Sequence, residues 1–401
     1  MKKSKIILHE ETRLLYEGTD LHVDGVRPDS PPIYPATAYI MRDLQELSNQ
    51  VDADGFVYNR CQNPDRFALG DMISNLELGK HTLVCSSGMN AICVTMLATL
   101  EKGDHVVANA ALYGEVIDFM SNILPKYGIE VTFANFLDAE EVHKAIKPQT
   151  KMLYTEIIAN PLTEVIDVKE IANIAHQHNA LLVVDSTVTT PFVIRPLEFG
   201  ADIVLHSLTK YFGGHSDLTA GSVTLNDDKV YQTIRNLYIL MGCATDSVTS
   251  WLCMRSIRTM GMRMDRQLSN AEKLAEGLSK CPNVRKVVHP SLETHPQHEL
   301  AKRQFRKGYG ALLSFYVKND RYIRREQINE FLHKLEFVEY LTTLGGIKTT
   351  LSHPVSSSHY GVPEEIRLKM GITEGLIRVS VGVEDIDDLL GDFYQALEVF
   401  A

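Results

Sequence analysis

The feature that most constrains the fold is a series of short apolar runs between residues 80 and 225. Each run has three or four residues, and amphipathic segments such as 168–178 separate them. Strands that are apolar on both faces and alternate with helices are typical of a mostly parallel sheet with helices on both sides. An α/β fold is therefore predicted, with strands at 82–85, 105–108, 131–134, 152–154, 181–184 and 203–205.

The segments on either side of this region have different patterns. Residues 1–65 contain proline-rich stretches such as 29–35, which predict an extended arm rather than a domain core. Residues 227–280 look helical throughout, with a break expected near Gly242. The remainder predicts a smaller α+β domain, with strands at 284–288, 312–317 and 376–381, a helix at 326–335, and a last helix that Asp385 can cap.

The length of 401 residues exceeds one typical core, so more than one domain is expected. The predicted division is an N-terminal arm at 1–65 that contacts a neighbouring subunit, a large domain at 66–260 and a small C-terminal domain at 261–401.

Composition excludes several classes of protein. The formal net charge of -11 and the lack of a long basic run argue against nucleic acid as the main partner. No apolar run is long enough to span a membrane, and the first residues lack the apolar core of a secretion signal. The six cysteines form no C-x-x-C pair, so a reducing cytoplasm is the simplest expected location.

One lysine follows the predicted strand at 202–205 directly. Lys210 lies in the string His-Ser-Leu-Thr-Lys-Tyr, where Ser207 and Thr209 flank it. Ligands of open α/β sheets bind at the carboxyl ends of the strands. Lys210 could therefore hold a carbonyl cofactor as a Schiff base, with the two hydroxyls on its phosphate. An exposed loop lysine fits this motif as well, whereas the partners of a penicillin-binding S-x-x-K signature are missing.

An acidic residue closes another apolar strand, about 25 residues before the lysine. Burial of Asp185 there would cost several kcal/mol unless a cation or donors lie beside it. The pyridinium nitrogen of pyridoxal 5'-phosphate (PLP) is such a cation, and a carboxylate would keep that nitrogen protonated. An aspartate that caps the next turn is the alternative interpretation.

Three further elements complete the pattern. Ser87, Gly88 and Met89 form a small-residue turn from a strand into a helix, and backbone N–H groups at a helix start bind phosphate. Tyr113 follows the strand at 105–108, where it could stack on a flat ring or act as general acid or base. Arg378 interrupts an apolar strand and could bind the carboxylate of an amino-acid substrate. A capped helix, a half-buried tyrosine and an edge-strand arginine are the alternatives.

A possible metal cluster is not predicted as a site. His289, His295, His298 and Glu299 lie close in sequence, but their spacing matches no zinc site. The histidines at 295 and 298 fit a loop that runs into a helix. No metal is expected.

The chain resembles the Cys/Met-metabolism family of PLP enzymes, the trans-sulfuration enzymes of fold type I. The resemblance runs from about residue 10 to the C-terminus, and its most specific string is 206–217. The family includes cystathionine γ-synthase, cystathionine β- and γ-lyases, methionine γ-lyase and the O-acylhomoserine sulfhydrylases. The other matching segments are 86–89, 160–161, 270–271, 344–346, 353–354 and 376–388.

The resemblance implies PLP as cofactor and a role for each candidate residue. Lys210 would carry the cofactor and shuttle protons, Asp185 would pair with the ring nitrogen, and Tyr113 would stack on the ring. Tyr58 and Arg60 would reach the phosphate of a neighbouring subunit, which implies at least a dimer with shared sites, and the resemblance implies a homotetramer built from two such dimers. The residues implied to hold the phosphate are Ser87, Gly88, Met89, Ser207 and Thr209. Asn160 would lie near the ring hydroxyl of the cofactor. Arg378 and Thr343 would contact the substrate.

The departures from the family pattern cluster around the expected substrate pocket. Asp-Asn-Thr becomes Asp-Ser-Thr at 185–187, and the segment at 156–161 lacks its first proline. Glu115 stands where methionine γ-lyases usually have a cysteine, and Thr342 where several cystathionine enzymes have a glutamate.

The predicted function is a lyase that cleaves the γ carbon–sulfur bond of methionine, homocysteine or cystathionine. A γ-replacement enzyme is the first alternative, and a β-lyase the second. A regulatory or scaffold protein with the same fold is the alternative from another class. Its expected signature is the loss of the lysine or the aspartate, and both are present.

Overall fold

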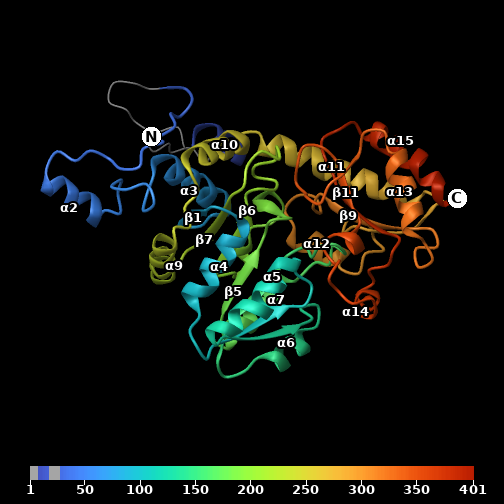
Figure 1. Cartoon of the computed structure of the whole chain (residues 1–401), viewed down its shortest axis with the longest axis horizontal. Coiled ribbons are helices and arrows are strands. Elements are labelled where there is room, and N and C mark those ends of the chain that lie inside the picture. Colours follow the sequence, from blue (N-terminus) through green and yellow to red (C-terminus); the bar gives the residue numbers. More distant parts are fainter. Residues whose placement is uncertain (1–7, 18–27) are drawn as a thin grey trace.

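The computed structural model describes residues 8–17 and 28–401. A seven-stranded sheet forms its centre, in the order β1-β7-β6-β5-β4-β2-β3 (Figure 1). Strand β7 pairs antiparallel with both of its neighbours, and the other pairs are parallel. The strands are β1 (His81–Cys85), β2 (His105–Asn109), β3 (Glu130–Ala134), β4 (Thr150–Glu156), β5 (Leu181–Asp185), β6 (Ile203–Ser207) and β7 (Gly221–Leu225).

The two faces of this sheet pack into two separate apolar cores. Successive side chains of a strand point to opposite faces, so in β6 Val204 joins one core while Leu205 joins the other. Helices α3 (Pro64–Glu77) and α7 (Val168–Gln177) contribute to the first core, and α4 (Gly88–Thr99) and α9 (Asp228–Met241) to the second. The predicted mostly parallel α/β fold is thus confirmed, while β7 is a strand that the sequence reading did not predict.

A second sheet of five strands lies in the C-terminal part, in the order β10-β11-β12-β9-β8 (Figure 1). Helices α11 (Met260–Ser279), α13 (Arg325–Lys334) and α15 (Ile386–Leu397) pack with it, and Asp385 caps α15 as expected. The domain limits at 65 and 260 stay a prediction. The strands are β8 (Val284–Val288), β9 (Leu312–Val317), β10 (Glu339–Tyr340), β11 (Thr350–Ser352) and β12 (Leu376–Ser380).

The expectation of an irregular N-terminal arm is wrong for two segments. Residues Glu10–Tyr16 form α1 and Leu44–Asp52 form α2. The Asp43 side chain accepts the Glu46 N–H and so caps α2, which is how a short polar segment gains a helical start. Helix α2 has no buried residue and extends away from the rest of the molecule in Figure 1.

The helical stretch after β7 breaks where expected. Gly242 has φ +68° and ends α9, and a second break before α11 separates it from α10 (Ser247–Ile257). The remaining helices are α5 (Gly114–Asp118), α6 (Ala139–Ala145), α8 (Thr190–Val193), α12 (His298–Gln304) and α14 (Glu364–Lys369), with short π or 3-10 turns at Phe119–Ile123, Leu124–Tyr127, Pro196–Phe199, Pro354–Ser356 and Glu398–Phe400. Across residues 8–17 and 28–401, no helix combines the length and apolarity that a membrane span requires.

Candidate active site

A cavity of about 240 Å³ lies where β4, β5 and β6 end and the small domain approaches them. It brings together most of the residues that the sequence singled out. These are Ser87, Gly88, Met89, Tyr113, Asn160, Asp185, Ser207, Thr209, Lys210, Thr343 and Arg378. A larger cavity of about 420 Å³ on the small domain contains none of them.

The turn before α4 forms one wall of the cavity. Ser87 caps the helix by accepting the Asn90 N–H at 3.0 Å. Gly88 lies so close to β6 that a Cβ there would stand 2.7 Å from the Ser207 Cβ. The first N–H groups of a helix have no intrahelical partner and favour an anion. With the Ser207 and Thr209 hydroxyls beside it, this turn has the donors that a phosphate group requires.

Two carboxylates end adjacent strands below that turn. Asp185 is opposite Glu156 in the β4–β5 register, and its Oδ1 accepts the Thr187 N–H at 2.8 Å. Burial raises the pKa of Asp185, and burial with the Asp185 charge raises the pKa of Glu156 to about 8. A cation beside Asp185 would relieve this repulsion, so the pair fits a protonated pyridine nitrogen. Glu156 was not predicted as a site residue, although its segment at 156–161 departs from the family pattern by lacking the first proline.

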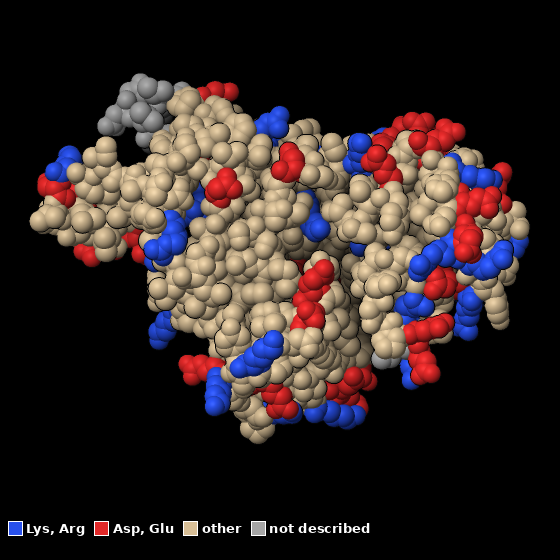
Figure 2. Space-filling view, in the orientation of Figure 1, with Lys and Arg blue, Asp and Glu red and all other residues tan. Residues whose placement is uncertain are grey.

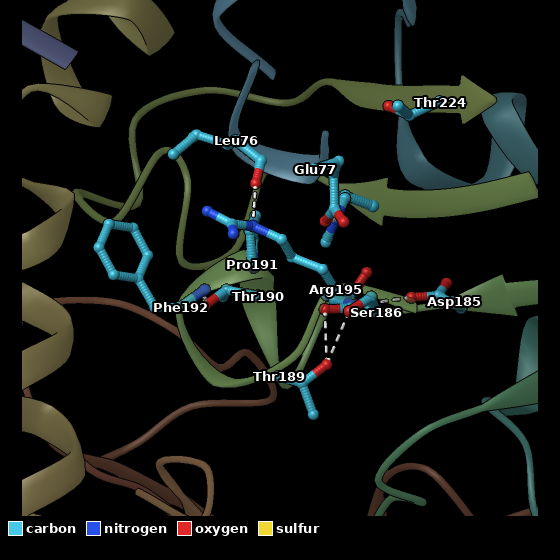
Figure 3. A network of polar contacts seen from close by, with 12 residues as sticks. Leu76, Glu77, Asp185, Ser186, Thr189, Thr190, Pro191, Phe192, Arg195 and Thr224 are labelled. Atoms are coloured by element: carbon cyan, nitrogen blue, oxygen red, sulfur yellow. Dashed lines mark hydrogen bonds and ion pairs between the residues drawn. The ribbon is translucent and has the colours of Figure 1, made fainter. Parts of the chain in front are cut away.

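Hydroxyl contacts hold the loop after β5. The Ser186 and Thr189 hydroxyls lie 2.7 Å apart within the network that Figure 3 shows. The Thr187 hydroxyl accepts the Ser207 N–H at 2.7 Å, which joins the ends of β5 and β6. Asp185 and the Ser207 to Lys210 loop are therefore fixed relative to each other.

Lys210 lies in this cavity rather than in solvent. Its Nζ donates to the Thr343 hydroxyl at 3.3 Å. Burial, and then the Arg378 charge, lower the pKa of Lys210, while Glu115 opposes this shift. Gly345, at φ +82°, packs on the lysine backbone, where a Cβ would stand 3.1 Å from the Lys210 Cα.

Arg378 is a buried residue on an inner strand, so the alternative of an edge-strand arginine facing water is wrong. It is 5% exposed, and β12 lies between β11 and β9. Its guanidinium donates to Asn160 Oδ1 at 3.3 Å and to the Thr343 carbonyl at 2.8 Å. Burial lowers the pKa of Arg378 to about 10. Its Nε has no partner among the described residues, so it can still bind a carboxylate.

Tyr113 precedes α5 at the cavity wall and is 41% exposed. Its backbone N–H donates to Glu156 Oε1 at 2.7 Å, which fixes the residue over the ends of β4 and β5. Burial and then a hydrogen bond to the Glu115 carboxylate raise the pKa of Tyr113, so its hydroxyl stays protonated.

Two predicted residues are absent from the cavity of their own chain. Arg60 donates to the Ile239 carbonyl at 2.8 Å, and its guanidinium lies 5.7 Å from the centre of the Tyr58 ring. Neither Tyr58 nor Arg60 lines the cavity.

The site and fold together define a class of protein. The chain belongs to the Cys/Met metabolism PLP-dependent enzyme family, whose model matches residues 11–398. The protein is therefore a PLP-dependent enzyme, a carbon–sulfur lyase or a γ-replacement enzyme, and the predictions of fold, cofactor and enzyme class are confirmed.

Relatives with several activities resemble this chain. It is 40% identical to a cystathionine gamma-lyase of Bacillus subtilis, with 92% of this chain and 94% of the relative covered. It is 37% identical to an L-methionine gamma-lyase of Fusobacterium nucleatum, with 96% and 97% covered. A solved structure of cystathionine gamma synthase from Xanthomonas oryzae has a TM-score of 0.92, 30% identity, and 98% and 99% coverage.

Proposed function

We propose that this enzyme is a γ-lyase that acts on a sulfur amino acid such as methionine, homocysteine or cystathionine. With one water, the substrate would give a 2-oxo acid, ammonia and a thiol. The observation that carries the proposal is the placement of Lys210 and Arg378 in one cavity, linked through Thr343. A γ-elimination needs a fixed substrate carboxylate and one base that reaches adjacent carbons, and this pair provides both.

Each residue has a role that follows from its surroundings. Bound PLP supplies an electron sink for the substrate α-carbon. Arg378 binds the substrate carboxylate, and Asp185 keeps the cofactor ring nitrogen protonated. Lys210 removes the α-proton, because its lowered pKa makes more of the free amine available near neutral pH. Tyr113 keeps its hydroxyl proton and can give it to the departing sulfur.

A charge next to Tyr113 favours one kind of leaving group. Asp185 would pair with the cofactor and Arg378 with the substrate carboxylate, while the Glu115 carboxylate hydrogen bonds to Tyr113 and its charge acts on Lys210. We expect it to favour substrates whose sulfur substituent carries an ammonium group.

A γ-replacement enzyme is the second candidate, supported by the likeness to a cystathionine gamma synthase. A β-lyase is the third, since a cystathionine beta-lyase of Lactococcus lactis is 38% identical. Product analysis with methionine, cystathionine and O-acetylhomoserine, with and without sulfide, distinguishes the three. Fast reaction of O-acetylhomoserine with sulfide, together with no 2-oxobutyrate from methionine, would overturn the γ-lyase proposal.

We infer a homotetramer, a dimer of dimers in which the arm of one subunit completes the site of its neighbour. Tyr58 and Arg60 do not reach their own cavity, and α2 leaves Leu44 82% exposed. Figure 2 shows charged groups over the small domain and the lower edge of the large one, while much of the face beside the arm is uncharged. All six cysteines are unpaired, which supports a cytoplasmic location.

A further inference from the structure

A buried acid–base pair lies directly behind the cofactor site. The His206 Nε2 and the Glu77 Oε1 are 2.5 Å apart, and both side chains are 0% exposed. Glu77 is the last residue of α3, and His206 comes one residue before Ser207 in β6. The Phe212 ring, 4.9 Å from the imidazole centre, helps to exclude water.

The pair faces away from the cavity. Leu205 belongs to the core on the α4 side and Ser207 lines the cavity, so the side chain between them points to the opposite face, toward α3. Asp185 lies on the neighbouring strand and lines the cavity. Figure 3 draws Glu77 and Asp185 in the same close-up, with no dashed line between them.

The two groups make a short side-chain contact with each other in a region closed to water. An ionised Glu77 without a cation would be costly at zero exposure. Glu77 Oε2 and His206 Nδ1 have no partner among the described residues, so each depends on the other. The titratable groups whose charges interact with Asp185 are Glu156 of β4, which opposes its ionisation, and His206 of β6, which favours it from behind the sheet. The charge of Asp185 also acts on Tyr154 of β4.

We propose that Glu77 and His206 form a buried ion pair that keeps Asp185 ionised from the opposite side of the sheet. Both are positioning residues, because neither lines the cavity. Their joint effect is to keep the carboxylate ready for the cofactor ring nitrogen against the charge of Glu156. The inference rests on the proposed role of Asp185.

The first test measures the protonation of His206 in the wild-type protein. Solid-state NMR of ¹⁵N-histidine protein, with the signal assigned by its loss in His206→Gln, reports both ring nitrogens. We expect both to carry protons at pH 7 to 8, in the apoenzyme and the holoenzyme. A neutral imidazole in both forms would overturn the proposal without any variant having to fold.

The second test measures cofactor affinity against pH. In Glu77→Gln and His206→Gln, we expect the PLP dissociation constant to rise about tenfold, the equivalent of one pKa unit of lost charge stabilisation. Each change should add almost nothing in an Asp185→Asn background, because the effect acts through that carboxylate. A purely structural pair would lower thermal stability and leave the dissociation constant unchanged.

A matched control separates this effect from the loss of any buried histidine. His105 is also 0% exposed, and it hydrogen bonds to Thr150 and Thr132 at the opposite end of the sheet. His105→Gln should lower stability without changing the PLP dissociation constant. If Asp185→Asn leaves PLP affinity unchanged, the proposed pairing of Asp185 with the cofactor ring nitrogen is wrong. If it weakens binding while Glu77→Gln does not, only this proposal fails.

Discussion

At the scale of single residues, Glu115 offers the most direct test of substrate choice. Its carboxylate hydrogen bonds to Tyr113 and acts on Lys210. A useful substrate pair is S-(2-aminoethyl)-homocysteine and S-propylhomocysteine, which differ by an ammonium group in place of a methyl. In Glu115→Gln, we expect the kcat/KM ratio of the cationic to the neutral substrate to fall about fivefold, as for one charge contact in water.

The control for this change is Glu140→Gln. Glu140 is also an acidic residue in the first turn of a short helix, but its carboxylate pairs with Lys144 on the surface. Glu140→Gln should leave the ratio of kcat/KM for the cationic and the neutral substrate as in the wild type. An unchanged ratio in Glu115→Gln as well would show that the carboxylate only supports the start of α5.

The two strand-end carboxylates predict how the apoenzyme responds to pH. The pKa of Glu156 is raised from 4.5 to about 8, so the folded chain binds more protons than the unfolded chain between these values. Stability should therefore fall as pH rises from about 4.5 to 8. Glu156→Gln, which can still accept the Tyr113 N–H, should remove part of this slope in thermal unfolding of the apoenzyme. A slope identical to the wild type would contradict the shared burial of the two carboxylates.

At the scale of elements, the contact between β7 and the turn before α4 leaves no room for a side chain on Gly221. A Cβ on Gly221 would stand 2.2 Å from the Ser87 carbonyl oxygen and 2.8 Å from the Gly88 nitrogen. Gly221→Ala should displace the phosphate turn, with a loss of about 1–3 kcal/mol of stability and weaker PLP binding. Fluorescence titration and thermal unfolding measure the two effects.

Gly391 provides the matched control, because nothing lies within 4 Å of a Cβ built there. It is inside α15, where alanine is favoured over glycine by about 1 kcal/mol. Gly391→Ala should therefore leave PLP binding unchanged and stability equal or higher. A Gly221→Ala enzyme with wild-type PLP affinity would contradict the close approach of β7.

The same elements show what the sequence could and could not predict. The parallel strands were predictable because unbroken apolar runs occur where both faces of a strand are buried. Strand β7 was missed since Ser222 and Thr224 are buried polar residues that break such a run. In α2 the apolar residues Leu44, Leu47 and Val51 recur at helical spacing after the cap at Asp43, but the proline-rich composition of the surrounding segment favoured an extended arm.

For the candidate site, the sequence could predict which residues take part but not how they contact one another. Its residues lie at strand ends and turns, where residue type alone suggests chemistry. Contacts between distant segments were not predictable, such as Glu77 with His206, 129 residues apart. The pairing of Glu156 with Asp185 required the register of two strands.

At the scale of the whole molecule, the arrangement of arm and cavity predicts complementation between two inactive variants. Lys210→Ala removes the central amine, and Arg60→Ala removes the arm cation that is proposed to reach a neighbour. In a hybrid dimer, the site with an intact Lys210 receives its arm from the subunit with an intact Arg60. Subunits mixed at random from the two variants should therefore recover about a quarter of wild-type activity, since half the dimers are hybrid and each has one intact site.

The control mixes Lys210→Ala with Asp185→Asn. Both of these changes lie in the cavity of the same chain, so no hybrid site is restored if Asp185 acts there as proposed. Activity is measured after unfolding and refolding the mixed variants together with PLP, with each variant refolded alone as reference. Recovery only in the Arg60 mixture requires a site built from two subunits, because no single chain in that mixture carries both intact residues. Activity no higher than the mean of the two variants would contradict the shared site and leave the lyase chemistry of the single cavity untouched.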